Sequence, residues 1–256
     1  MKMKTLLKRI AIFLSQKCSL LLFALLLQTS PNYAQCTGNA IQFDGVDDYV
    51  NAGVQASLEM SSAITMEAWI YPTGPGSQPQ AGGIIINREG EYEIARFEDG
   101  TIRLAIANTS PGWRTDWDNT GYVAPLNVWT HIALTYSAAA RIIKVYANGT
   151  EIYSLPGSGD IGDYPDLASE DEFRIGGRQH AYNTNQIFQG IIDEVRIWKV
   201  AVSQSIIQQW MNKSVNSDHP DFTNLAGYWK FDEGNGSTTA DASGNGNMGT
   251  LTNLPT

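Results

Sequence analysis

The chain has 256 residues, 43% of them hydrophobic, and a formal net charge of −9 from 26 acidic and 17 basic side chains. This length allows one all-β domain or two smaller ones. The acidic balance argues against binding to nucleic acid or to anionic membranes, because both attract positively charged surfaces. It suits neutral ligands and cations, and it would also keep a protein with no such ligand soluble.

Residues 1–34 have the pattern of a secretory signal peptide. The apolar run 20–27 is too short to span a membrane as a helix, and small or polar residues lead to an expected cleavage after Ala34. The mature domain, 36–256, would then carry twelve basic against 26 acidic residues, a net charge of about −14. Five basic residues precede or flank the apolar run: Lys2, Lys4, Lys8, Arg9 and Lys17.

The alternative to plain secretion is a bacterial lipoprotein, with lipid attached to Cys36. It is the weaker reading because Gln35, and not a small residue, precedes this cysteine. Since Cys18 leaves with the leader, Cys36 is alone in the mature chain, and no intramolecular disulfide can form. The protein is therefore expected to be secreted or attached at the cell surface, with no membrane span in the mature chain.

From residue 40 onward, apolar or alternating runs recur about every ten residues and end in turn residues. No helical pattern alternates with them, which argues against a parallel α/β sheet and predicts an all-β, antiparallel two-sheet jelly-roll sandwich. Asn148-Gly149 is the strongest hairpin signal, and 98–100 is a second turn. Strands are expected over 40–43, 49–51, 64–71, 84–87, 92–97, 102–107, 128–136, 142–147, 173–176 and 225–231, with long loops over 110–126 and 156–171.

The stretch 188–211 is the reference point for the rest of the chain. Its first half is a strand in which acidic and basic residues interrupt β-branched and aromatic bulk. Ser203 then opens the one short C-terminal helix, because apolar residues follow it at three- and four-residue spacing: Ile206, Ile207, Trp210 and Met211.

Seven segments in order resemble the laminin-G-like, concanavalin A-like jelly-roll family of secreted bacterial proteins. They are AIQFDGVDDYV (40–50), ITMEAWIYP (64–72), VWTHIALTYS (128–137), IIKVYANGTEI (142–152), FRIGG (173–177), FQGIIDEVRIWKVAVS (188–203) and LAGYWKFDEGNGS (225–237). The resemblance covers nearly all of 40–256. It implies two antiparallel sheets packed face to face, with the last segment completing this sandwich or starting an adjacent one; one domain is the preferred reading.

The first candidate site is a structural calcium ion. Asp44, Asp47 and Asp48 crowd one turn, and the resemblance brings the strand with Asp193 near that turn. Hard divalent cations prefer six to eight oxygen ligands, which carboxylates and backbone carbonyls supply. Some members of the wider superfamily hold calcium in this general region. The alternative is a solvated turn, with Asp193 paired to Arg196 or to a backbone amide.

The second candidate site would bind sugar. Trp113, Asp116 and Trp117 lie in the expected loop 110–126, and Arg178, His180 and Tyr182 form a similar cluster before residue 188. Aromatic faces stack on pyranose rings, while charged and amide groups hydrogen-bond the hydroxyls. Either tryptophan could instead fold back and cap the sandwich.

A glycoside hydrolase of the same superfamily is the enzymatic alternative. It needs two carboxylates that face one cleft, and the Glu-x-Asp-x-x-Glu strand pattern of the resembling glucanases is missing. Glu89, Glu91 and Glu93 alternate but look like a hairpin edge, and Asp193 and Glu194 are adjacent and would face opposite sides of a strand. The prediction is therefore a non-catalytic module that binds glycans, steadied by calcium, or else a cell-surface adhesion module that binds proteins.

Overall fold

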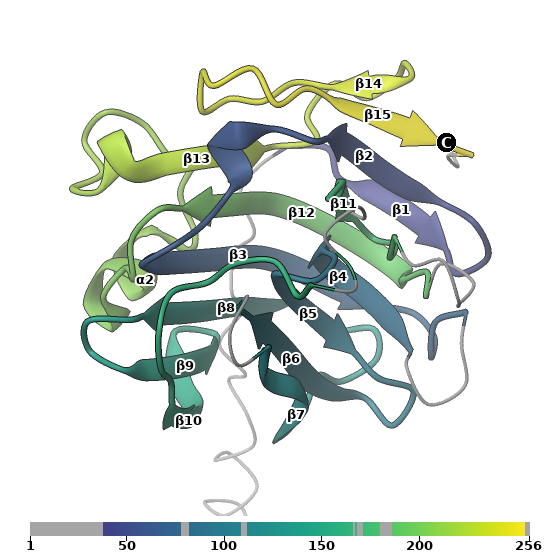
Figure 1. Cartoon of the computed structure of the whole chain (residues 1–256). Helices are drawn as coiled ribbons and strands as arrows, with labels where there is room; N and C mark the ends of the chain where they lie inside the picture. The colour runs from purple at the N-terminus through teal and green to yellow at the C-terminus, as the bar shows by residue number, and fades with distance from the viewer. Residues whose placement is uncertain are drawn as a thin grey trace, which may run out of the picture. The chain divides into compact units, whose positions relative to one another are not determined.

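The computed structural model describes residues 38–77, 82–108, 112–165, 167, 171–179 and 186–253, and two antiparallel sheets dominate it (Figure 1). Sheet A runs β1 (Ile41–Asp44), β12 (Gln189–Trp198), β3 (Ala63–Pro72), β8 (Thr130–Ser137), β9 (Ile142–Ala147) and β10 (Thr150–Pro156), and β13 (Leu225–Trp229) also pairs with β12. Sheet B runs β14 (Thr238–Thr239), β15 (Gly249–Thr252), β2 (Tyr49–Gly53), β11 (Phe173–Ile175), β4 (Gly83–Arg88), β5 (Tyr92–Arg96), β6 (Thr101–Ala107) and β7 (Trp113–Val123).

Helical structure among the described residues is limited to α2 (Gln204–Trp210) and two short 3₁₀ turns, η2 (Ala56–Leu58) and η3 (Phe222–Asn224). The predicted all-β sandwich with one short C-terminal helix is confirmed. In this described part of the chain, α2 and the two turns are all too short to cross a bilayer as helices.

The core lies between the sheets because strand side chains alternate between two faces. In β3, Ile64, Met66, Ala68 and Ile70 all belong to the main core, as the alternation predicted. Phe173 of sheet B and Trp229 of sheet A stack with ring centroids 4.9 Å apart, so aromatic packing joins the two layers directly.

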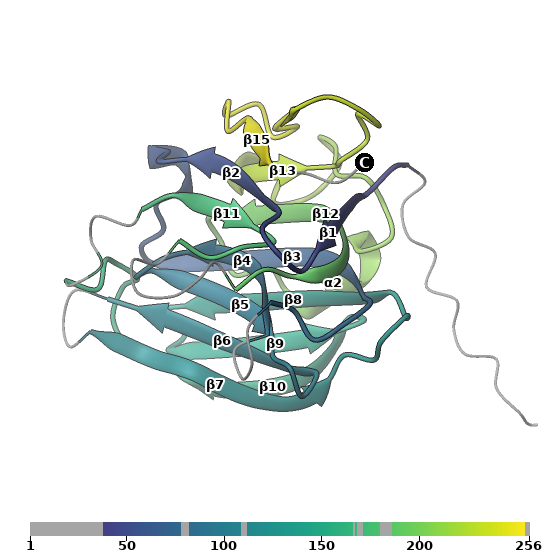
Figure 2. The ribbon, with the colours of Figure 1, turned by 90° about the vertical axis from the view of Figure 1, so that its right-hand side faces the viewer.

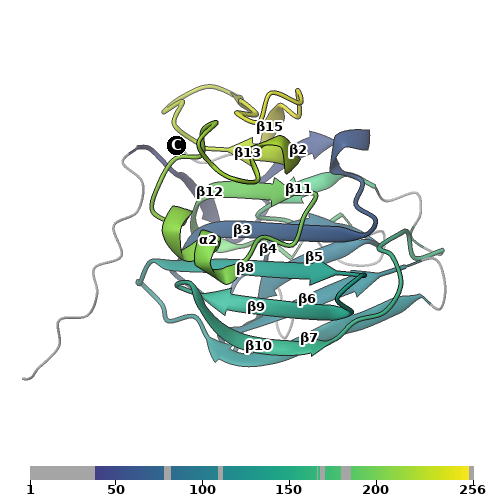
Figure 3. The ribbon, with the colours of Figure 1, turned by 90° about the vertical axis from the view of Figure 1, so that its left-hand side faces the viewer.

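The outer face of sheet A is covered by α2 and the segment after it (Figure 3). Ile207 and Trp210 are buried on the sheet side of the helix, and Trp69 of β3 donates from Nε1 to the Met211 carbonyl at 2.7 Å. His219, expected in a polar loop, is only 3% exposed because it stacks on Trp198 with centroids 4.3 Å apart. The apolar stripe of the helix therefore closes this face.

A β-bulge divides β12 into two halves. Its pairing with β3 shifts between Asp193 and Arg196, and Glu194 has a positive φ of 52°. Before the bulge, the other edge of β12 pairs with β1; after it, the same edge pairs with β13. A bulge bends a strand and interrupts side-chain alternation, which explains how one strand serves two successive partners.

The C-terminal segment completes this sandwich. β13 joins sheet A, as expected for residues 225–231, and the polar tail adds β14 and β15 to sheet B beside β2. Figure 2 shows β15, β2 and β11 in succession at one end of the molecule. The tail carries few apolar residues but is anchored by polar bonds: Asp241 accepts the backbone N–H groups of Tyr228 and Asn247.

Candidate functional site

The candidate ligand site lies on the outer face of sheet B, over β4, β5 and β7. Ile86, Ile94 and Leu104 point into the core, so the residues that follow or precede them, Asn87, Glu93 and Ala105, face outward. Register places Arg174 opposite Asn87, Asn87 opposite Glu93, and Glu93 opposite Ala105. A polar row therefore crosses this face of the sheet.

Arg178, in the segment after β11, is fixed on this row. Its Nε and Nη2 donate to the two carboxylate oxygens of Glu89, each at 2.6 Å, and its Nε is 3.5 Å from Glu93. Asn87 donates to Glu89 at 3.1 Å and accepts the backbone N–H of Gln179 at 3.1 Å. Two parallel bonds to one carboxylate give strong geometric definition, so this segment is held firmly on the β4–β5 hairpin.

The alternating glutamates do lie at a hairpin, that of β4 and β5, but their side chains are buried. Glu89, Glu91 and Glu93 are 1%, 2% and 0% exposed. Burial, together with the charge of Glu89, raises the pKa of Glu93 to about 8 against the opposing effect of Arg178. The raised pKa favours the protonated form of Glu93 over the ordinary range for a glutamate.

Trp117 lies at the margin of the polar row. It is half-buried on Ile84, Ala95 and Phe97, with its ring centroid 5.4 Å from that of Phe97 in an edge-to-face contact. The guanidinium carbon of Arg178 is 5.4 Å from the same ring, within cation–π range. Asp116, beside it in the chain, is exposed. A half-exposed indole with charged neighbours can stack on an apolar ligand face and hydrogen-bond its polar edge.

The structure thus brings together three of the six predicted ligand residues: Asp116, Trp117 and Arg178. Trp113 begins β7, but its side chain lies outside the described part; His180 and Tyr182 lie outside the described residues. The expected loop 110–126 is wrong over 113–123, which forms β7. Three register shifts against β6 and a positive φ of 57° at Trp117 explain why no clean alternation marked this strand.

Glu89 and Glu93 were missed as members of this site. The available signal was the four-residue Glu spacing around Gly90, which puts one acid in the turn and one on the outgoing strand. Sequence alone could not show that Arg178 contacts both Glu89 and Glu93.

The predicted metal residues Asp44, Asp47 and Asp48 do converge. One carboxylate oxygen from each lies within 4.8 Å of the others. Asp48 is 1% exposed; it accepts the Asp44 N–H at 2.8 Å through one oxygen, and its other oxygen, Oδ1, is buried without a hydrogen-bond partner. Burial is the main cause that raises the pKa of Asp48 to about 6. A donorless carboxylate oxygen among three acids fits a hard cation.

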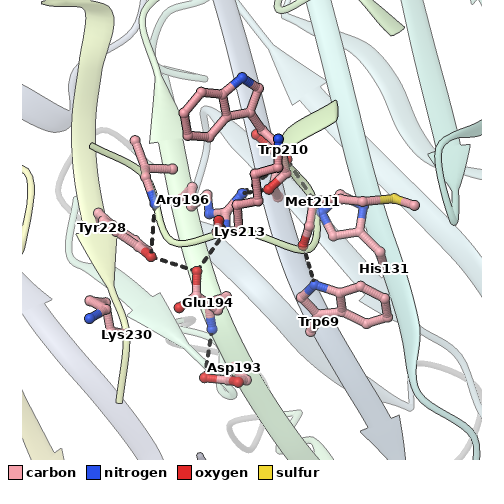
Figure 4. A network of polar contacts seen from close by, with 12 residues as sticks. Trp69, His131, Asp193, Glu194, Arg196, Trp210, Met211, Lys213, Tyr228 and Lys230 are labelled. Atoms are coloured by element: carbon pink, nitrogen blue, oxygen red, sulfur yellow. Dashed lines mark hydrogen bonds and ion pairs between the residues drawn. The ribbon is translucent and has the colours of Figure 1, made fainter. Parts of the chain in front are cut away.

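Asp193 does not join this group, so that part of the predicted metal set is wrong. Register places Asp44 opposite Gln189 and Ile41 opposite Ile192, so Asp193 is about 13 Å farther along β12 at ~3.3 Å per residue. At the bulge, Asp193 and Glu194 instead lie in the polar network on the outer face of sheet A (Figure 4). Asp193 accepts the N–H of Glu194 at 2.9 Å, the backbone-amide alternative considered above.

Glu194 instead holds the outer face of sheet A together (Figure 4). Its Oε2 accepts Arg196 Nη2 at 2.6 Å and the Tyr228 hydroxyl at 2.5 Å. Arg196 also donates to the carbonyls of Trp210 and Lys213, at 3.2 and 2.7 Å. These bonds connect the bulge to the helix end, and the three side chains are at most 3% exposed. This acidic residue is structural.

The sequence profile of the concanavalin A-like lectin/glucanases superfamily matches residues 44–208, more than half of the chain. The protein belongs to this superfamily. The match runs from the last residue of β1 to residue 208 within α2, and so leaves out β13, β14 and β15.

Among solved structures, the chain is similar to a protein from Bacteroides ovatus that is provisionally described as carbohydrate-binding. The TM-score is 0.65 at 22% identity, and the similarity covers 85% of this chain but 59% of the other. The chain is also similar, with a TM-score of 0.47 and 15% identity, to the carbohydrate-binding module of a Ruminococcus gnavus sialidase, covering 67% and 95% of the two chains. No curated protein matches significantly.

Proposed function

We propose that the mature protein is a non-catalytic module that binds carbohydrate on the outer face of sheet B around Trp117. The observation that carries this is the half-buried indole of Trp117, with the guanidinium carbon of Arg178 5.4 Å from its ring and the exposed Asp116 next to it in the chain. Such a platform suits a ring with one apolar face and a hydroxylated edge. The fold shared with a protein provisionally described as carbohydrate-binding makes sugars the first ligand class to test.

The buried glutamates support this site from beneath. Glu89 is saturated by Arg178 and Asn87, and Glu93 is fully buried. Ligand binding should depend on them through the position of Arg178, since neither presents a carboxylate to solvent. A glycosidase would need two accessible carboxylates across one cleft, so measurable glycan turnover lost in Glu89→Gln or Glu93→Gln would contradict the non-catalytic proposal.

The test is a glycan-panel screen of residues 36–256, followed by calorimetric titration of any sugar that binds. Trp117→Ala should weaken binding at least tenfold. Trp129→Ala is the matched control, because Trp129 is also half-buried, against Tyr71 with ring centroids 5.5 Å apart. Equal losses of sugar affinity in the two variants, or no binding of any glycan in the panel, would contradict the proposal.

The alternative is an adhesion module that binds a cell-surface protein. The same variants separate the two: if Trp117→Ala reduces adhesion to cells from which glycans have been removed enzymatically, the partner is a protein. Residues 1–34 are proposed to export the chain. Recovery of the mature protein from the medium would support secretion, and retention in the membrane that is lost in Cys36→Ser would favour the lipoprotein.

The proposal includes a structural calcium ion at Asp44, Asp47 and Asp48, without Asp193. The donorless Oδ1 of Asp48 supports it. An ion there would hold the turn between β1 of sheet A and β2 of sheet B, and so connect the edges of both sheets.

A further inference from the structure

A second cluster of acidic side chains lies beside the β4–β5 hairpin and takes no part in the Trp117 site. Glu91 is in the hairpin turn, Asp163 in the segment after β10, and Asp171 just before β11. One oxygen from each lies within 4.8 Å of the others. With Glu59, Met60, Arg88 and Gly162 they line a pocket of about 270 Å³.

Backbone bonds hold the segment of Asp163 in place against sheet B. Tyr164 donates to the Gly90 carbonyl at 2.8 Å, and Gly162 donates to the Ala107 carbonyl at 3.2 Å. Asp163 lies between these two anchored residues. A side chain at Gly90 would have its Cβ 3.0 Å from Leu167 Cβ, so the segment packs directly on the hairpin. Three separate parts of the chain therefore supply the three carboxylates.

Two oxygens in the pocket lack a hydrogen-bond donor. Glu91 is 2% exposed; Arg88 binds its Oε1, while its Oε2 is buried without a partner. Asp171 Oδ1 is likewise buried without a partner. Burial, with a contribution from Asp163 and against the effect of Arg88, raises the pKa of Glu91 to about 7. The lining contributes four carboxyl groups, including Glu59, against one guanidinium.

We propose that Glu91, Asp163 and Asp171 bind a divalent cation, with Ca²⁺ the best match. The three donors are all oxygen, the choice of hard cations, and the group contains neither the imidazole nor the thiolate that zinc and copper favour. Oxygens within 4.8 Å of one another can share an ion at the 2.3–2.6 Å that calcium requires. The ion neutralises the donorless oxygens and fixes the segment before β11 to the hairpin that carries Glu89 and Glu93.

The test is calorimetric titration of CaCl₂ into chelator-treated residues 36–256, paired with Tb³⁺ luminescence excited through tyrosine. Tyr164 is adjacent to Asp163, so a bound Tb³⁺ should be sensitised. Asp163→Asn and Asp171→Asn should each weaken one binding event at least tenfold. Asp47→Asn and the exposed Asp218→Asn are the controls, and that event should persist in both.

The proposal fails if Asp47→Asn removes all calcium binding, or if Asp163→Asn and Asp171→Asn both bind as tightly as the wild type. Circular dichroism of each variant checks that the sheets are intact. Both substituted residues lie in connecting segments and are only partly buried, so the sheets should tolerate either substitution. The two variants therefore report independently on the same ion.

Discussion

Arg178 donates through Nε and Nη2 to both carboxylate oxygens of Glu89, 89 residues away in the sequence. This buried pair connects the segment after β11 to the β4–β5 hairpin and sets the guanidinium 5.4 Å from the Trp117 ring. Because one residue faces both the glutamates and the indole, the stability of the hairpin and the shape of the candidate ligand site are coupled.

Arg178→Ala should lower the free energy of unfolding by about 3–5 kcal/mol, because it leaves Glu89 buried without its charge partner. Urea denaturation measures this loss. In the double variant Arg178→Ala/Glu89→Gln the loss should be smaller than in Arg178→Ala. If Arg178→Ala unfolds like the wild type, the ion pair does not form in solution.

Glu93 should make the protein less stable as the pH rises. Its pKa is about 8 in the folded chain against an ordinary value of 4.5, so the folded state binds more protons between these values and the free energy of unfolding falls across that window. Glu93→Gln should reduce the fall between about pH 5 and pH 8 by roughly 1 kcal/mol or more, since one pKa unit equals about 1.4 kcal/mol. Denaturation at a series of pH values tests this; parallel wild-type and variant curves would contradict it.

Tyr228→Phe should cost about 1–3 kcal/mol of stability, because it removes a donor to the buried Glu194 carboxylate. The midpoint of urea unfolding reports the change. Tyr71→Phe, at a half-buried tyrosine beside Trp129, is the control and should shift the midpoint less. Equal shifts would show that the hydroxyl bond in Figure 4 contributes nothing specific.

Gly149→Ala should destabilise the protein more than Gly246→Ala does. Both glycines have positive φ, 72° and 82°, so each alanine pays a backbone cost of about 1–2 kcal/mol. At Gly149 the new Cβ would also lie 2.7 Å from Gln208 Cγ of α2, whereas at Gly246 nothing lies within 4 Å. Thermal denaturation compares the two variants. Equal losses of stability would mean that α2 moves to accommodate the new Cβ without an energetic cost.

Calcium should raise the melting temperature by several degrees, since binding to the folded state alone adds about 2.7 kcal/mol at a hundredfold excess over Kd. In an Asp163→Asn background, Asp48→Asn should remove the remaining shift. Asp193→Asn in that background should keep it, because register separates Asp193 from the turn. Loss of the remaining shift when Asp193→Asn is added to that background would restore the four-residue site.

Particular residues show where prediction from sequence succeeded. The alternation of β3, the Asn148-Gly149 turn and the helix after Ser203 are local patterns, and each was confirmed. Strand β7 was missed because its register shifts hide the alternation. Asp193 was misplaced because the register of β12 against β1, which puts Gln189 and not Asp193 opposite Asp44, has no local signal in the sequence.

The sequence by itself determined the sandwich, the short helix after Ser203, the superfamily and the acidic turn at residues 44–48, because side-chain periodicity and turn chemistry act within a few residues. Only the tertiary structure decided which acids meet. Glu89 with Arg178, and Glu91 with Asp163 and Asp171, depend on strand register and on the path of long connections. Those follow from the packing of the whole core, since an ion pair across 89 residues has no local signal.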